Sequence, residues 1–248
     1  MKKILALFLT FSFLAPLSAH AALTDSLQAY WKLDESSGNA ADEVNSNTLT
    51  NNNTATYSAG KLNNAVNFAS ASSQWLGIAN GSQSANIKSA GDYSVSFWIK
   101  AASTFAADGP VVWSRNNAAQ DSAYIQMVTT AGNTHALLRI RQDASTIQTI
   151  DLTMTTNFVN GTWYHIVATY DFTELKARLY QDGSLVSTAQ TITMTTQMAT
   201  TGTFDLGTYR GGASNFLDGS MDEFGYWNRE LTSTEVSELY GSGTPPSY

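Results

Sequence analysis

The sequence has no cysteine among its 248 residues, which excludes disulfide bonds, thiol catalysis, thiolate metal sites and a lipid-modified N-terminal cysteine. Charge is also scarce, because only 13% of the residues are charged whereas about 25% is usual in a soluble globular protein. The charges present are mainly negative, with 20 Asp and Glu against 13 Lys and Arg. An acidic chain is poorly suited to nucleic acid or an anionic membrane, so we expect neither as a partner.

The chain also lacks an apolar run long enough to span a membrane. The longest run covers residues 4–17, whereas a spanning helix needs about 20 residues. Two lysines precede this run, and an Ala-His-Ala sequence ending at Ala21 follows it, as at a signal-peptidase site. We therefore predict a signal peptide over residues 1–21, no membrane anchor, and a secreted protein, extracellular or periplasmic. Cleavage after Ala21 would leave 11 basic and 20 acidic residues, a formal charge of −9.

What the sequence does contain is hydrophobic residues, 43% of the total, which alternate with polar residues in short runs typical of β-strands. Residues 163–170 carry bulky side chains on both faces, which predicts a central strand. Asp182-Gly183 between two β-rich runs predicts a hairpin with a type I′ turn, in which Tyr180 pairs with Leu185. Further strands are predicted at residues 29–33, 65–68, 75–78, 93–100, 111–114, 123–129, 136–142, 203–206 and 219–228.

The sequence predicts a single short helix, near its C-terminal end. Thr232 and Glu235 have the spacing of a capping box, and Gly241 lies where a left-handed C-terminal cap is expected. The residues that follow, 242–248, are predicted to form a flexible tail. Many short strands and one late helix predict an all-β fold, an antiparallel two-sheet jelly-roll sandwich over residues 22–241 with one short C-terminal helix.

Five segments, in order, resemble the laminin-G-like, concanavalin-A-like jelly roll of secreted bacterial proteins. They are AYWKLDESSG at 29–38, YSVSFWIK at 93–100, GTWYHIVA at 161–168, LYQDGSLV at 179–186 and LDGSMDEFGYWNREL at 217–231. The resemblance implies two stacked antiparallel sheets, with the strand near Tyr30 and Trp31 beside the strand near residues 223–227. Lectins, adhesion modules, pentraxins, glucanases and spacers share this fold, so function has to be argued from the residues.

The resemblance also implies a calcium site. Members of the family often bind calcium between the loop after the first strand and the start of the last strand, and Asp42, Asn47 and Asp222 occupy the matching positions. Carboxylate and amide oxygens are the ligands that calcium prefers. Asp and Asn also occupy turns simply to hydrogen-bond the backbone, and this alternative stays open.

Catalytic residues are not apparent in the sequence. The glucanases of this fold carry a Glu-x-Asp-x-Glu strand motif, which is absent here. His165 lies within an apolar strand and is predicted to be a core residue, whereas His135 follows a Gly-Asn-Thr turn and is predicted to be solvated. Neighbours on a strand point to opposite faces, so no catalytic pair is formed by the adjacent acids Asp34-Glu35, Asp42-Glu43 or Asp222-Glu223.

Aromatic and polar residues on presumed loops or polar strand faces predict a glycan-binding surface, which needs ring faces and planar polar groups. The alternative for most of these aromatics is a packing role in the core. Leu138 and Ile140 alternate with two arginines, which would therefore project from the face opposite the core. Gly211 and Gly212 allow close approach of a ligand to the backbone beside Tyr209. The candidate ligand-binding residues are Trp113, Tyr124, Arg139, Arg141, Tyr209 and Arg210.

The leading interpretation is a secreted, non-catalytic recognition module that binds an extracellular glycan or glycoprotein and holds a calcium ion. The first alternative is a structural or adhesive domain that contacts proteins without binding glycans. The second alternative is a polysaccharide-cleaving enzyme, which the missing strand motif disfavours.

Overall fold

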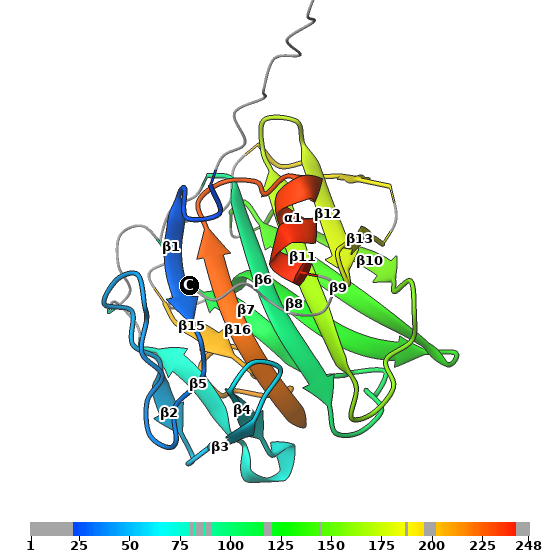
Figure 1. Cartoon of the computed structure of the whole chain (residues 1–248). Helices are drawn as coiled ribbons and strands as arrows, with labels where there is room; N and C mark the ends of the chain where they lie inside the picture. Colours follow the sequence, from blue (N-terminus) through cyan, green and yellow to red (C-terminus); the bar gives the residue numbers. More distant parts are fainter. Residues whose placement is uncertain are drawn as a thin grey trace, which may run out of the picture.

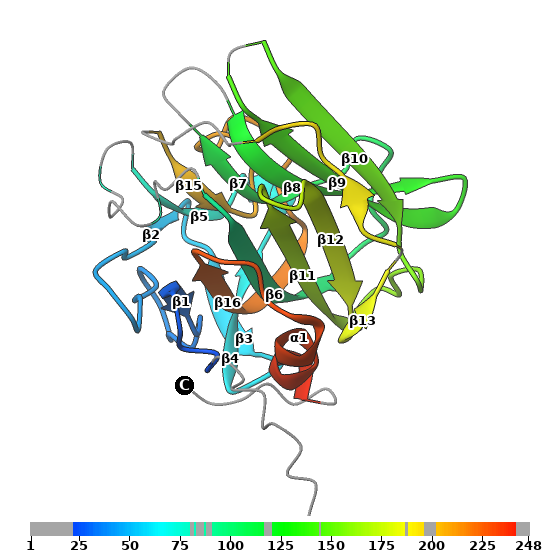
Figure 2. The same cartoon turned by 90° about the horizontal axis from the view of Figure 1, so that it is seen from above.

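The computed structural model describes residues 22–79, 82, 87, 91–116, 121–143, 145–186, 188–195 and 202–241. The predicted signal peptide, 1–21, and the predicted tail, 242–248, lie outside the described residues. The described chain folds into two antiparallel sheets that lie face to face (Figures 1 and 2). This arrangement confirms the predicted jelly-roll sandwich.

One sheet has nine strands within the described part of the chain, in the order β13-β12-β11-β6-β16-β4-β3, with β1 beside β16 and β14 beside β12. The strands are β1 (Leu27–Trp31), β3 (Thr56–Ala59), β4 (Asn64–Phe68), β6 (Tyr93–Ala101), β11 (Trp163–Asp171), β12 (Lys176–Gln181), β13 (Ser184–Leu185), β14 (Gln190–Thr191) and β16 (Gly219–Trp227).

The other sheet has seven strands among the described residues, in the order β10-β9-β8-β7-β15-β5-β2. These strands are β2 (Thr50–Asn52), β5 (Trp75–Ile78), β7 (Val111–Asn116), β8 (Asp121–Thr130), β9 (Asn133–Arg141), β10 (Ile147–Thr153) and β15 (Phe204–Leu206). A short 3-10 helix, Ser70–Ser72, precedes β5.

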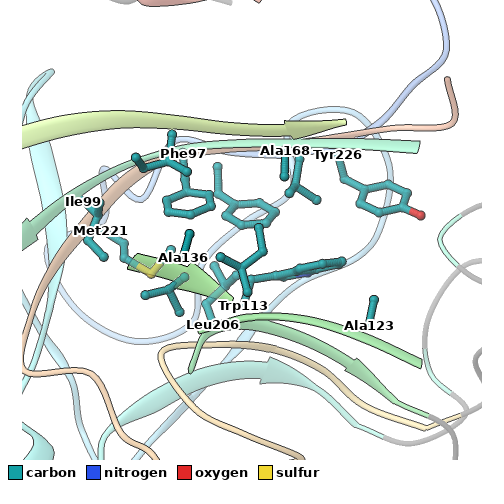
Figure 3. Close-up of a cluster of buried hydrophobic side chains, with 14 of the residues drawn as sticks. Phe97, Ile99, Trp113, Ala123, Ala136, Ala168, Leu206, Met221 and Tyr226 are labelled. Carbon is teal, nitrogen blue, oxygen red and sulfur yellow. The ribbon is translucent and has the colours of Figure 1, made fainter. Parts of the chain in front are cut away.

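The core fills the space between the two sheets, and Figure 3 shows side chains from both sheets pointing toward one another. Phe97 and Met221 of the nine-stranded sheet face Trp113 and Leu206 of the seven-stranded sheet (Figure 3). All four side chains are fully buried. Alternation along each strand produces this core, because successive side chains point to opposite faces.

The helix α1 (Ser233–Tyr240) lies on the outer face of the nine-stranded sheet (Figure 1). The predicted capping box is confirmed, because Thr232 Oγ1 accepts a 3.3 Å hydrogen bond from the Glu235 amide and the Thr232 amide donates 2.8 Å to Glu235 Oε2. Val236 and Leu239 bury the helix against this face of the sheet. Among the described residues no helix is long and apolar enough to cross a membrane.

Strand pairing agrees with several specific predictions. Trp31 lies opposite Phe224, so β1 pairs beside β16 as the resemblance implied. Tyr180 lies opposite Leu185, which confirms the register of the hairpin. The sequence did not predict β2, β3, β10 or β14, three of which have only two to four residues. Such short polar strands carry too little alternation to be recognised, and their neighbours define them instead.

Candidate functional site

Two of the predicted ligand residues face each other across a strand pair. Tyr124 of β8 lies directly opposite Arg139 of β9, and the Arg139 guanidinium carbon lies 4.7 Å from the centre of the Tyr124 ring. Residues directly opposite in an antiparallel pair share one face of the sheet. Leu138 and Ile140 are fully buried in the core, so Arg139 projects from the outer face as the alternation predicts.

A third predicted residue joins this pair from a distant segment. Tyr209, in the loop between β15 and β16, packs edge-to-face on Tyr124 with ring centres 5.6 Å apart and ring planes at 88°. The exposed side chain of Arg210 follows, with its guanidinium carbon 5.8 Å from the Tyr209 ring centre. Arg210 has a φ of 50°, so the backbone turns sharply at this position.

Polar side chains complete a hollow around these rings. Asp108 Oδ1 accepts hydrogen bonds of 3.1 Å from Gln126 Nε2 and 3.0 Å from Asn215 Nδ2. These three residues, with Tyr124, Arg139, Tyr209 and Val111, line a hollow of about 170 Å³. A neighbouring hollow of about 190 Å³ shares Asp108 and Asn215 with it.

A buried carboxylate holds the loop that carries Tyr209. Asp205 is fully buried, and its Oδ2 accepts hydrogen bonds of 2.5 Å from Thr203 Oγ1, 3.1 Å from Asn116 Nδ2 and 2.8 Å from the Gly211 amide. Burial raises the pKa of Asp205 to about 7, although these hydrogen bonds oppose the shift. No sequence pattern indicates this role, because two of the three partners of Asp205 are distant in sequence, Asn116 in β7 and Gly211 in the loop after β15.

The remaining predicted ligand residues lie elsewhere. Trp113 is fully buried in the core, where its ring packs 6.0 Å from Tyr93 and 6.1 Å from Phe204, so it is inaccessible to a surface ligand. The neighbouring Val112 is equally buried, and alternation could not show which of the two faces inward. Arg141 is buried at the end of β9 and does not line the hollow.

Asp42 and Asn47, predicted as metal ligands, lie together in the loop after β1. Asp42 Oδ1 accepts from the amides of Tyr30 and Val44, both at 3.0 Å. Asp42 Oδ2 accepts from the Asn47 amide at 3.2 Å and from Asn47 Nδ2 at 2.8 Å. Four N–H groups therefore surround this carboxylate, which fits a hydrogen-bonded turn better than a cation site. Calcium binding here stays a prediction.

Asp222, the third predicted metal ligand, has a different set of partners. It lies in β16 at a β-bulge, and its Oδ2 accepts from the amides of Lys61 and Leu62 at 2.7 and 3.0 Å. Its Oδ1 is buried and has no hydrogen-bond partner among the described residues. Burial, with a smaller contribution from the charge of Asp34, raises the pKa of Asp222 to about 7. None of these partners is shared with Asp42.

One cluster of three acids was not predicted. Asp171, Glu174 and Glu230 bring carboxylate oxygens within 4.8 Å of one another, the sole such group found among the described residues. Arg178 forms ion pairs with both glutamates, and its contact with Glu174 is 3.0 Å. The cluster is therefore an arginine-bridged ion-pair network on β11, β12 and the segment after β16.

Of the two histidines among the described residues, the environment of one agrees with the prediction and that of the other does not. His165 is buried, its Nε2 lies 2.9 Å from Ser96 Oγ, and burial lowers its pKa to about 3, which agrees with a neutral core residue. His135 was predicted in a solvated turn but lies within β9, where its Nδ1 is 2.7 Å from Asp151 Oδ1. β9 already begins at Asn133, three positions before the predicted start of the strand at residue 136, so the turn is shorter than predicted.

Comparisons with solved structures show the same fold in binding domains. Domain 4 of AbnA, a GH43 extracellular arabinanase from Geobacillus stearothermophilus solved with arabinotriose, has a TM-score of 0.64 and 20% identity, over 87% of this chain and 98% of that chain. The binding domain of Paraclostridial Mosquitocidal Protein 1 has a TM-score of 0.66 and 16% identity, over 88% of this chain and 52% of that chain.

The binding domain of Botulinum neurotoxin serotype G is similar at a TM-score of 0.64 and 16% identity, over 86% of this chain and 50% of that chain. The chain thus spans about half the length of these two toxin domains, and at such identities the likeness shows the fold alone. No curated protein matches the chain. Residues 71–237 match a family model, and the chain belongs to the family that this model describes, the concanavalin A-like lectin/glucanases superfamily.

Proposed function

We propose that the chain is a secreted, non-catalytic carbohydrate-recognition domain that binds its ligand in the hollow of Tyr124, Arg139 and Tyr209. The observation that carries the proposal is the convergence of these three residues, from β8, β9 and the loop after β15, around one depression. All three are among the ligand residues that the sequence predicts.

The chemistry of the hollow suits a sugar. The half-buried ring of Tyr209 supplies apolar surface for sugar C–H groups, and Tyr124, which is only 6% exposed, packs edge-to-face against that ring. The half-buried Arg139 brings a positive charge to the hollow, and its Nε donates a 3.2 Å hydrogen bond to Thr149 Oγ1. Asp108 and Gln126 add carboxylate and amide oxygens as acceptors for sugar hydroxyl groups, since both donors of the Gln126 amide are already used by Asp108 Oδ1 and the Gly109 carbonyl. Two arginines, Arg139 and Arg210, favour a ligand that carries an acidic or sulfated group.

The comparisons support a recognition role. The Geobacillus arabinanase domain, which has nearly the same extent as the similar part of this chain, was solved with arabinotriose. The toxin domains of the same fold are described as binding domains. Membership of a family that includes lectins is consistent with this role, although the family also includes glucanases.

The carboxylates of the hollow favour binding over hydrolysis. Glycoside hydrolysis uses two carboxyl groups that flank the scissile bond. Among the residues that line the Tyr124 hollow, Asp108 is the single acid, and it is engaged by the amides of Gln126 and Asn215. The neighbouring hollow adds Asp218. Reducing-end release from laminarin, agar or alginate is the assay that would favour the enzyme alternative.

A glycan array, followed by calorimetric titration of each hit, tests the proposal. We expect Arg139→Ala and Tyr209→Ala each to weaken binding at least about tenfold, which corresponds to about 1.4 kcal/mol. Lys176→Ala is the matched control, because it removes one positive charge from β12 of the other sheet. Glycans that bind Arg139→Ala and Tyr209→Ala as tightly as Lys176→Ala would contradict the site in the Tyr124 hollow. An array on which no glycan binds would favour the alternative of a domain that contacts proteins.

A further inference from the structure

A larger hollow lies at the β2 edge of the seven-stranded sheet. It measures about 500 Å³ and is lined by the loop after β1, by Asn51 of β2 and by the start of β3, which includes Thr56 and Tyr57. β2 is the edge strand of the seven-stranded sheet and β3 the edge strand of the nine-stranded sheet, and both lie in the same corner of the molecule (Figure 1). The hollow is therefore built from the edges of both sheets.

This edge hollow is separate from the Tyr124 hollow. β2 is three strand positions away from β7 in the sheet order β7-β15-β5-β2. At a strand spacing of about 4.8 Å, that separation is about 14 Å. The two hollows have no lining residue in common.

Hydrogen bonds fix the walls of the edge hollow. Asn51 Nδ2 donates to the carbonyl oxygens of Gly38 at 3.0 Å and Ala55 at 2.7 Å, and Asn51 Oδ1 accepts 2.8 Å from the Ala55 amide. The Tyr57 hydroxyl donates to the same Gly38 carbonyl at 3.0 Å. The Asn51 amide donates 3.0 Å to Asn39 Oδ1. A pre-formed wall lowers the entropy that a ligand must overcome on binding.

Several polar groups of the wall remain available to a ligand. The hydroxyls of Ser36, Ser37 and Thr56 and the side-chain nitrogen of Asn39 form no hydrogen bond with another described residue. They surround the half-buried ring of Tyr57. An aromatic ring with hydroxyl and amide groups around it matches a sugar, whose C–H groups lie against the ring and whose hydroxyls exchange hydrogen bonds with the rim.

The charge pattern restricts the ligand further. No lining residue of the edge hollow is charged. The Tyr57 hydroxyl is neutral at pH 7 like that of any tyrosine, and burial together with the nearby negative charge of Glu35 raises its pKa further. A carboxylate or sulfate on the ligand would find no cation here and would be repelled by Glu35.

We propose that the edge hollow is a second carbohydrate site, which takes a neutral, hydroxyl-rich sugar unit. Its volume falls within the range of about 300 to 1,000 Å³ that is typical of small-ligand pockets. The site extends the proposed function, because a chain with two separate sugar sites binds a polysaccharide through avidity. It does not depend on the Tyr124 hollow, from which it differs in position and in charge.

The test uses calorimetric titration of residues 22–248 with arabinotriose, xylotriose and cellotriose as neutral probes and trigalacturonic acid as a charged probe. Ser37→Trp places a large ring in the edge hollow, and Ser145→Trp, on an exposed turn between β9 and β10, is the matched control. We expect at least one neutral probe to bind, and Ser37→Trp to weaken that binding at least tenfold. The Ser145→Trp control should leave the binding unchanged.

A tryptophan at position 37 can also disturb the loop, so a second variant is needed. Thr56→Val keeps the shape of the threonine side chain and removes only its hydroxyl. Loss of one hydrogen bond of about 1 kcal/mol predicts binding that is about fivefold weaker. Failure of all three neutral probes to bind, or binding that Ser37→Trp and Thr56→Val leave unchanged, would overturn the second site. Binding that only Arg139→Ala abolishes would overturn it as well, yet would support the function proposed for the Tyr124 hollow.

Discussion

The side chain of Asp205 accepts a 2.8 Å hydrogen bond from the backbone amide of Gly211 and so attaches the loop that carries Tyr209 to β15. The same oxygen accepts from the side chains of Thr203 and Asn116. The position of the Tyr209 ring over Tyr124 therefore depends on a carboxylate that lies beneath the sheet surface and out of reach of a ligand.

We expect Asp205→Ala to lower the free energy of unfolding by about 2 to 3 kcal/mol, because it leaves several buried donors without an acceptor. Hydrogen exchange of the Gly211 amide should become faster, and sugar binding in the Tyr124 hollow should weaken. Chemical denaturation and exchange measured by NMR check these effects. Asp151→Ala, which removes an exposed acid from β10, is the control. Unchanged exchange at Gly211 would show that Asp205 does not hold the loop.

A second prediction concerns Gly212 in the same loop. Gly212 has a φ of +85°, and a Cβ added there would lie 2.6 Å from Trp75 Nε1. Gly132 has a φ of +82° but no atom within 4 Å of an added Cβ. Both alanine variants bear the backbone strain of about 1 to 2 kcal/mol, and Gly212→Ala alone adds a steric clash. We expect Gly212→Ala to lower the melting temperature more than Gly132→Ala does, and to weaken sugar binding in the Tyr124 hollow. Equal melting temperatures of the two variants would exclude the clash.

The buried acids predict how stability depends on pH. Burial raises the pKa of Asp205 and Asp222 to about 7 and that of Glu223 to about 8. These groups hold a proton more tightly in the folded chain than in the unfolded chain, so the stability that they contribute is lost as the pH rises through 7 to 8. We expect the melting temperature to rise as the pH is lowered from about 8.5 to about 6.5.

Asp222→Asn and Glu223→Gln, which cannot titrate, should flatten this rise. Burial lowers the pKa of His165 to about 3, so that residue destabilises the fold only below its ordinary pKa of 6.5 and does not affect the chosen window. Differential scanning calorimetry across the series checks the prediction. A melting temperature that stays constant, or that rises toward pH 8.5, would contradict it.

Asp42 allows a test of the predicted calcium ion. Its four N–H partners predict that Asp42→Ala lowers the free energy of unfolding by about 1 to 3 kcal/mol in the absence of calcium. Ser46→Ala, in the same exposed loop, is the control. A rise in the melting temperature of the wild type on adding millimolar calcium, absent from Asp42→Ala, would support an ion at this site. If calcium does not raise the melting temperature of the wild type, Asp42 serves only to hydrogen-bond the turn.

The sandwich could be predicted from the sequence because the patterns that indicate it lie within single segments of the chain. Thr232 and Glu235 satisfy a capping rule within four residues, and the hairpin register follows from Asp182 and Gly183. The outward projection of Arg139 followed from alternation with Leu138 in one strand.

The site was predicted less completely because it depends on contacts between distant segments. Asp108 meets Gln126 and Asn215, and no pattern within one segment indicates such a meeting. Trp113 was misplaced for a related reason, since β7 is buried on both faces and alternation is then uninformative. The edge hollow was not predicted because β2 and β3, which form part of its walls, are short polar strands without a recognisable sequence pattern.

The pairing of β1 with β16 determines how the domain responds to mechanical tension. Leu27 lies opposite Trp227, so the chain enters β1 and leaves β16 at the same end of this strand pair. A load applied at Leu27 and Trp227 would therefore break the hydrogen bonds of the pair one after another, rather than all at once in shear. Both strands belong to the nine-stranded sheet, so opening this pair breaks no hydrogen bond of the seven-stranded sheet that carries the Tyr124 hollow.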